Sequence, residues 1–106
     1  MKRIIAIIAA VLGLGLNSPA QISRYCVFTR GENEFHTYRI PAIVQAKDGT
    51  LLAFAEARKN GRGDSGDIDL VLKRSTDGGT KWSSIITVWD DGENVCGNPC
   101  PIVDRE

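Results

Sequence analysis

Five charged residues near the middle of the chain are of types that bind anions or transfer protons. Arg39 stands before an apolar run and Arg58 closes the next one, while Asp64, Asp67 and Asp69 follow within GRGDSGDIDL at residues 61–70. A guanidinium stays charged and can hold a carboxylate through two parallel hydrogen bonds. An aspartate can accept or donate a proton. These residue types indicate an active site, a calcium loop or an adhesion peptide.

The sequence around these residues predicts strands joined by tight turns. β-rich runs predict four consecutive antiparallel strands, at residues 40–46, 51–57, 68–73 and 84–89. In that order Arg39, Arg58 and Asp64 lie at one end of the sheet. The turns at residues 47–50 and 75–82 lie at the other end, about 20 Å away at about 3.3 Å per residue. An open meander leaves two edges exposed and is typical of one blade of a β-propeller.

The first hairpin predicts how the two arginines are placed. If Asp48 and Gly49 form a two-residue loop, Arg39 faces Arg58 across the strands. Two opposed arginines repel, so this register implies an anion between or beside them. The alternative is a bulge, or a slip of one residue, that separates the pair.

Composition and cysteine usage narrow the function classes. The chain has 106 residues, enough for one small domain, and its 13 Lys and Arg balance its 13 Asp and Glu. This balance does not indicate a nucleic-acid partner. Cys26, Cys96 and Cys100 match no zinc spacing and His36 is the single histidine, so we expect no metal and no cofactor. In an odd set, one cysteine stays free or pairs beyond this chain.

The N-terminus has the composition of a secretory signal. Lys2 and Arg3 precede an apolar run of 13 residues, and the small residues Ser18 and Ala20 follow. A membrane anchor is the alternative, but a bilayer requires about 20 apolar residues. We therefore expect a signal at 1–20, a mature domain at 21–106 with no membrane span, and a secreted, periplasmic or cell-surface location. At the other terminus, residues 100–103 read as an unpaired strand start, so we expect the chain to be truncated.

Two motifs in order carry a family resemblance. Tyr38-Arg39-Ile40-Pro41 comes first, and an Asp box, Ser75-x-Asp77-x-Gly79-x-x-Trp82, follows. Between them, an Ala-x-Ala-Arg strand end precedes an aspartate by six residues. From about residue 24 onward the chain resembles the sialidase (neuraminidase) family, of the bacterial secreted type. The resemblance implies an all-β fold, with this chain holding the first blade and the start of the second of a six-bladed β-propeller.

The resemblance also implies an activity and its residues. It implies an exo-α-sialidase, a retaining glycoside hydrolase that releases terminal sialic acid from glycoproteins, glycolipids or oligosaccharides. Arg39 matches the arginine that begins the triad around the sialic acid carboxylate, and Arg58 a second arginine near the sugar 4-hydroxyl. Asp64 matches the acid/base aspartate, with Asp67 as the fallback. Asn98 aligns with a substrate-contacting residue, although it could equally be a turn residue before proline.

The nucleophile that the resemblance implies is a tyrosine activated by a carboxylate. Tyr25 and Tyr38 are poor candidates, because Tyr38 adjoins Arg39 and should point to the opposite face. The other two triad arginines are also missing, so we expect the chain alone to be inactive. The Asp box should stabilise its own turn and take no part in catalysis.

Three other functions compete with hydrolysis. Residues 61–65 match an integrin-binding pentapeptide, although so short a match arises easily by chance. Asp64, Asp67 and Asp69 could bind calcium, but their spacing lacks the alternating pattern of a calcium loop. The third is a non-catalytic Asp-box propeller that binds sialylated glycans in the manner of a lectin.

Overall fold

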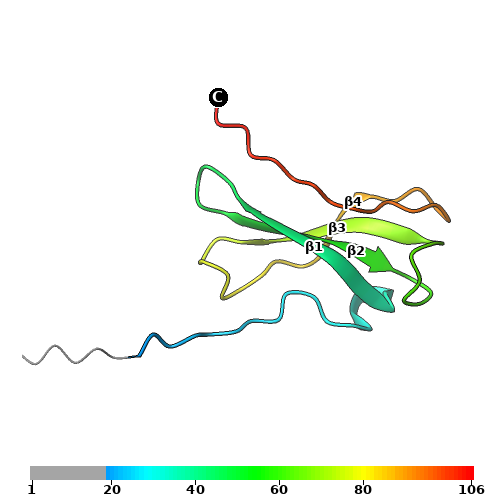
Figure 1. The fold of residues 1–106 in the computed structure, drawn as a ribbon, viewed down its shortest axis with the longest axis horizontal. Coiled ribbons are helices and arrows are strands. Elements are labelled where there is room, and N and C mark those ends of the chain that lie inside the picture. Colours follow the sequence, from blue (N-terminus) through cyan, green and yellow to red (C-terminus); the bar gives the residue numbers. More distant parts are fainter. Residues whose placement is uncertain (1–18) are drawn as a thin grey trace, which may run out of the picture.

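The protein folds as one open antiparallel sheet. The computed structural model describes residues 19–106, and within them the sheet has the strand order β1-β2-β3-β4 (Figure 1). The all-β meander predicted from the sequence is confirmed. The predicted signal at 1–20 falls almost wholly outside the described residues. Within them, no helix is long and apolar enough to cross a membrane. The elements are a 3-10 turn η1 (Glu32–Glu34), β1 (Thr37–Gln45), β2 (Leu51–Arg58), β3 (Ile68–Ser75) and β4 (Ile86–Trp89).

The β1–β2 turn contains three residues rather than the predicted two. The Ala46 amide donates to the Thr50 carbonyl at 2.8 Å, and the Gly49 amide donates to the Ala46 carbonyl at 3.0 Å. Gly49 has a φ of 88°, the left-handed conformation that closes a three-residue hairpin loop and favours glycine. The register next to the turn is therefore shifted from the predicted one.

A bulge near the other end of β1 shifts the register again. Between Arg39 and Ala42 the pairing with β2 is irregular, and Ile40 there has a φ of 53°. Arg39 consequently faces Glu56, and Thr37 faces Arg58. The predicted Arg39–Arg58 pairing is wrong, because a longer turn and a bulge separate the two residues along the strands.

Strand alternation gives the sheet two unlike faces. One, the alanine face, carries Ala53, Ala55 and Ala57 of β2, all buried. These small side chains let the segment before β1 lie close to the sheet. The aromatic rings of Phe28 and Tyr38 stack there, with centroids 5.2 Å apart. The core on this face therefore joins the N-terminal segment to the sheet, and its buried members are Phe35, Ala55, Ala57 and Val71.

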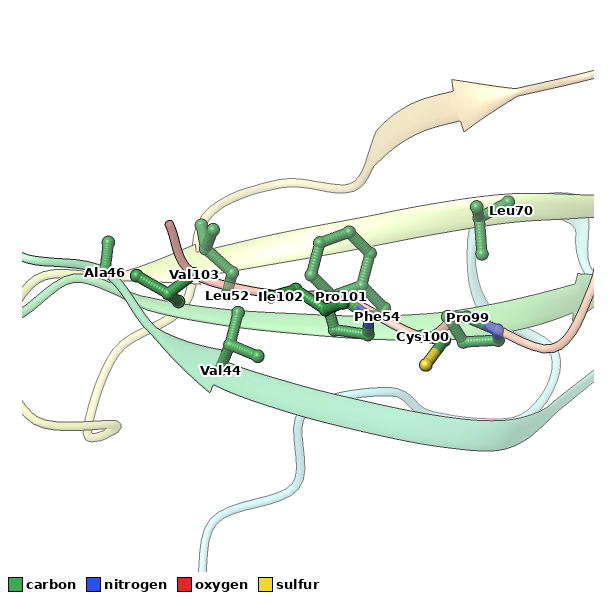
Figure 2. Close-up of a pocket in the computed structure, with 10 residues that line it drawn as sticks. All are labelled: Val44, Ala46, Leu52, Phe54, Leu70, Pro99, Cys100, Pro101, Ile102 and Val103. Atoms are coloured by element: carbon green, nitrogen blue, oxygen red, sulfur yellow. The ribbon is translucent and has the colours of Figure 1, made fainter. Parts of the chain in front are cut away.

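The opposite face of β2, the arginine face, carries Leu52, Phe54, Glu56 and Arg58. Residues 99–103, which are in no strand, cross its apolar part and line an open hollow of about 420 Å³ with it (Figure 2). Nearer the end of β2 the face turns from apolar to charged at Glu56. One face of the sheet therefore has an apolar part, lined by Val44, Leu52, Phe54 and Leu70, and a charged part that begins at Glu56 and Arg58. We call the charged part the rim.

The Asp box forms the turn after β3. The Asp77 carboxylate accepts hydrogen bonds from the Ser75 hydroxyl at 2.9 Å and the Lys81 amide at 2.9 Å. The Lys81 amide, followed by Ser75, holds the pKa of Asp77 below its usual value. The Trp82 indole donates to the Gly79 carbonyl at 2.9 Å. This turn lies at the opposite end of the sheet from the loop between β2 and β3, so it stabilises structure away from the charged rim (Figure 1).

Candidate active site

Arg58 is the centre of the charged rim. Its side chain is only 3% exposed, and its Nε and Nη2 donate to Oε2 of Glu56 at 3.1 and 2.6 Å. Its Nη1 donates to the carbonyls of Arg62 and Gly63 at 2.7 and 2.8 Å. The hydrogen bond to Glu56 is the first cause that raises the pKa of Arg58. A buried guanidinium is stable only when paired and hydrogen-bonded, and Arg58 meets this requirement.

The β2–β3 loop, residues 59–67, is folded around that guanidinium. The Lys59 amide donates to the Asp67 carbonyl at 3.1 Å and closes the loop at its base. Gly66 has a φ of 99°, a conformation that other residues rarely adopt. Because two loop carbonyls accept from Arg58, the loop is tied to the end of β2 and Asp64 is brought above it.

Asp64 lies between the two arginines. Its Oδ1 accepts from Nη1 of Arg58 at 2.7 Å and from Nη1 of Arg39 at 3.1 Å. The Asp64 side chain is 81% exposed and that of Arg39 46%. The hydrogen bond from Arg58, and then the charges of Arg58 and Arg39, hold the pKa of Asp64 below its usual value. The anion between the arginines is thus a carboxylate of the chain itself, and in this arrangement Asp64 is ionised.

Glu56 is a member of the rim that the sequence reasoning missed. The residue is 3% exposed, and its Oε1 accepts the backbone amide of Asn98 at 3.0 Å. Gly97, next to Asn98, lies so close to Oε1 that a Cβ there would overlap it. Strand periodicity was the available signal, since Glu56 stands two residues before Arg58 and shares its face. Asn98 is thereby brought to the rim through its backbone.

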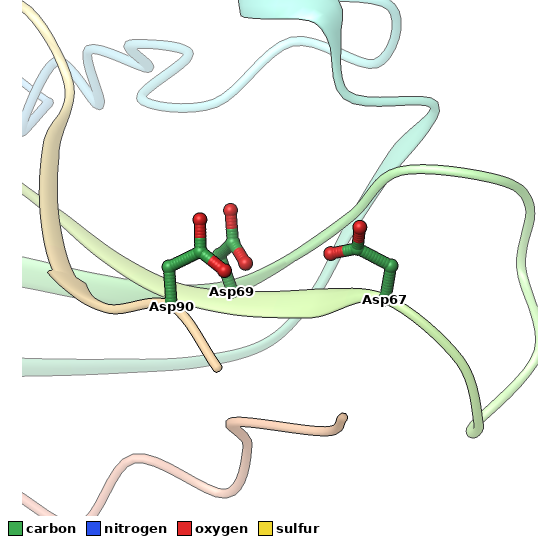
Figure 3. Close-up of side chains that lie close together, drawn as sticks. All are labelled: Asp67, Asp69 and Asp90. Atoms are coloured by element: carbon green, nitrogen blue, oxygen red, sulfur yellow. The ribbon is translucent and has the colours of Figure 1, made fainter. Parts of the chain in front are cut away.

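A second ionic cluster lies at the same end of the sheet on the alanine face. Nζ of Lys59 is 3.0 Å from Oδ1 of Asp67, 3.3 Å from Oδ2 of Asp69 and 3.8 Å from Oδ2 of Asp90. The three carboxylates gather along the start of β3 and the end of β4 (Figure 3). The hydrogen bond to Asp67 is the first cause that raises the pKa of Lys59. Burial is the first cause that raises the pKa of Asp69.

This cluster changes the interpretation of the other two aspartates. Asp67, the fallback acid, pairs with Lys59 rather than with the arginines. From its alternation with Ile68 and Leu70, the sequence predicts that Asp69 faces away from the packed side of the blade. This prediction is wrong, because Asp69 is buried beside the core of the alanine face. The calcium hypothesis grouped Asp64 with Asp67 and Asp69, but in the structure the third carboxylate beside them is that of Asp90. The Lys59 ammonium lies among the three carboxylates.

No tyrosine or cysteine side chain in the described part of the chain is a hydrogen-bond partner of Arg39 or Arg58. The Tyr38 hydroxyl donates to the Glu32 carbonyl at 2.9 Å, and burial raises the pKa of Tyr38. Tyr38 packs against the core of the alanine face, as expected for a residue on the opposite face from Arg39. Cys26, Cys96 and Cys100 are thiols in the described part of the chain. Pairing with a cysteine beyond this chain stays a prediction.

Comparison with known proteins shows which proteins this chain is similar to. No family model matches the chain. It is 46% identical over 66% of its length to an exo-alpha-sialidase of Arthroderma benhamiae and 42% identical over 68% to one of Aspergillus fumigatus. It is 34% identical over 71% to a sialidase of Paraclostridium sordellii. The chain spans only 19% of the length of each of these relatives. With this similarity, and with the two motif arginines and the aspartate gathered at one rim, the chain belongs to the sialidase family.

Proposed function

We propose that this chain is part of a secreted exo-α-sialidase that releases terminal sialic acid from glycoproteins, glycolipids or oligosaccharides with retention of configuration. The observation that carries the proposal is the convergence of Arg39 and Arg58 on the single carboxylate of Asp64. Two guanidiniums that already hold one carboxylate are suited to an acidic sugar. Two relatives of the chain are named exo-alpha-sialidase, which supports this assignment.

The substrate carboxylate takes the place of Asp64 beside Arg39 in this proposal. Arg39 has a half-exposed side chain, so an incoming anion reaches it from solvent. Arg58 is saturated by Glu56 on one edge and by the loop on the other. Arg58 therefore remains fixed while Asp64, the most exposed member of the rim, moves aside.

Displacement also prepares Asp64 to act as an acid. Two guanidiniums balance Glu56 and Asp64 in the free rim, and a substrate carboxylate adds one further negative charge. Once Asp64 leaves the arginines, it loses the contacts that lower its pKa and can hold the proton that the leaving glycosidic oxygen requires. Having given that proton to the leaving group, the Asp64 carboxylate would then accept a proton from the water that attacks the sialyl intermediate.

The remaining parts of the proposal concern the whole protein. Both outer strands expose apolar side chains, Ile43 of β1 at 59% and Trp89 of β4 at 64%, which suits a blade covered by neighbouring blades. The tyrosine nucleophile, its carboxylate partner and two further arginines would come from those blades. The chain by itself is therefore inactive in this proposal.

Hydrolysis of a fluorogenic sialoside tests the proposal. The protein that contains this chain should release the fluorophore, and NMR of the first product should show the α-anomer of sialic acid. The 106-residue chain alone should release none, and activity there would contradict the assignment of the nucleophile to other blades. Binding of sialylated glycans without hydrolysis would favour the lectin alternative. Integrin-dependent cell adhesion that Asp64→Glu abolishes would favour the adhesion peptide.

A further inference from the structure

We infer that Glu56 is a positioning residue that holds Arg58 and Asn98 in one fixed arrangement at the rim. The inference rests on the proposed function, because it concerns how that sialoside site is set. Both carboxylate oxygens of Glu56 are engaged within the chain, and the residue is buried. Its effect on the reaction would pass through the residues that it holds.

The two oxygens of Glu56 have separate partners. Oε2 accepts both Nε and Nη2 of Arg58, which fixes the plane of the guanidinium and leaves Nη1 directed at the loop. Oε1 accepts the Asn98 amide, from a segment 42 residues further along the chain. A single carboxylate therefore sets the distance between Arg58 and the Asn98 backbone.

The surroundings of Glu56 leave no substitute for these contacts. Its side chain is 4% exposed, so solvent does not reach the carboxylate to replace a lost partner. Gly97 permits the close approach, because any side chain at that position would overlap Oε1. Asn98 adopts a left-handed φ of 52°, which the hydrogen bond to Glu56 helps to maintain.

The effect of Glu56 reaches Asp64 through Arg58. Because Glu56 fixes one edge of Arg58, Nη1 of the same guanidinium is held where it meets Asp64 at 2.7 Å. A glutamine at position 56 cannot reproduce both contacts, since it offers one acceptor oxygen and one NH₂ donor. Either the Asn98 amide or the guanidinium would then face a donor.

Glu56→Gln is the central test, with Glu93→Gln as the matched control because Glu93 is exposed. In the protein that contains the chain, Glu56→Gln should lower kcat/KM for a sialoside by about 100-fold, the cost of a small misplacement in a site. Its circular dichroism and melting curve establish whether it is folded. Glu93→Gln should stay within twofold of the wild type. A folded Glu56→Gln protein with unchanged kcat/KM would overturn the inference.

Two further measurements keep the test decisive. Gly97→Ala retains the glutamate charge but displaces it, so it should lower kcat/KM by about 10-fold, and an unchanged value would overturn the inference even if Glu56→Gln fails to fold. NMR titration of Asp64 gives a readout without activity. Its pKa should rise in Glu56→Gln, because a displaced Arg58 loses the hydrogen bond that lowers it, whereas removal of the Glu56 charge alone would lower it further; Glu93→Gln should leave it unchanged. If the wild-type protein hydrolyses no sialoside, the proposed function fails, while this titration still decides whether Glu56 positions Arg58.

Discussion

Two ionic clusters stand at the same end of the sheet on opposite faces, and they are built in opposite ways. The rim cluster consists of Arg39, Glu56, Arg58 and Asp64, with two charges of each sign. The lysine cluster consists of Lys59, Asp67, Asp69 and Asp90, with three acids around one ammonium. The β2–β3 loop supplies residues to both, so one short segment serves two purposes.

The difference lies in which partner is fixed. In the rim cluster the cation Arg58 is 3% exposed, and the anion Asp64 is 81% exposed and can leave. In the lysine cluster Asp69 is 4% exposed, while Lys59, at 33%, reaches it on a flexible stem. Because Arg58 keeps Glu56 and the loop carbonyls when Asp64 leaves, a foreign anion can take the place of Asp64 beside Arg39. A fixed acid with its own lysine instead ties the loop to the sheet.

The largest effect is expected at two acids of the β2–β3 loop, Asp64 of the rim cluster and Asp67 of the lysine cluster. Asp64→Asn should lower kcat for sialosides with poor leaving groups by about 10²- to 10⁴-fold, the usual contribution of a general acid. The matched Asp67→Asn, three residues away and paired with Lys59, should change kcat by only a few-fold. Steady-state kinetics with aryl sialosides of graded leaving-group pKa measures both. An Asp67→Asn loss that exceeds the Asp64→Asn loss would reverse the roles of the two clusters.

A smaller effect is expected at the exposed arginine of the rim. Arg39→Ala should lower kcat/KM by about 10- to 100-fold, because a charged hydrogen bond to the substrate carboxylate and to the transition state is lost. Arg62→Ala is the control, since Arg62 is an exposed residue of the same loop that contributes its carbonyl to Arg58. Binding of a sialic acid analogue by calorimetry should weaken only in Arg39→Ala. Equal weakening in both variants would mean that general positive charge, rather than this contact, attracts the ligand.

The sequence predicted the end of the sheet where these clusters lie, but not their pairing. Strand periodicity and turn residues were sufficient to order the strands and to bring Arg39, Arg58 and Asp64 together. They could not reveal the bulge at Ile40, because a positive φ at a β-branched residue is imposed by its tertiary surroundings. The predicted register therefore placed Arg39 opposite Arg58, whereas in the structure Arg39 is opposite Glu56.

Long-range contacts were the other limit on the prediction. Asn98 meets Glu56 across 42 residues, and Asp90 joins the lysine cluster from the end of β4. Neither contact leaves a local periodic pattern in the sequence. Asp69 shows the same limit, since its alternation with Ile68 and Leu70 could not show that the core and Lys59 bury it on the alanine face.

The lysine cluster should respond in stability rather than in kinetics. Lys59→Met leaves three carboxylates without their cation and should lower the Tm of the protein at pH 7 by roughly 5 °C. Because burial already raises the pKa of Asp69, its ionised form is disfavoured in the fold, and the deficit should shrink as pH falls through that pKa. Lys59→Arg, which keeps the charge, should melt near the wild type in calorimetry. An equal deficit at pH 7 and pH 4 would indicate lost packing instead of lost charge.

The smallest expected effect is a change in the acidity of Asp64. Its pKa lies below the usual 3.8, so its ion pairs add stability above that value and lose it as pH falls through the depressed pKa. Carboxyl ¹³C NMR should show a modest rise of this pKa in Arg39→Ala. The rise should be larger in Arg58→Lys, because the Arg58 hydrogen bond is the first cause of the depression. A saturating sialic acid analogue should raise the pKa further still if it displaces Asp64 from both arginines. If the analogue binds and the pKa of Asp64 stays depressed, the ligand does not take the place of this carboxylate, and the rim would hold substrate without preparing its acid.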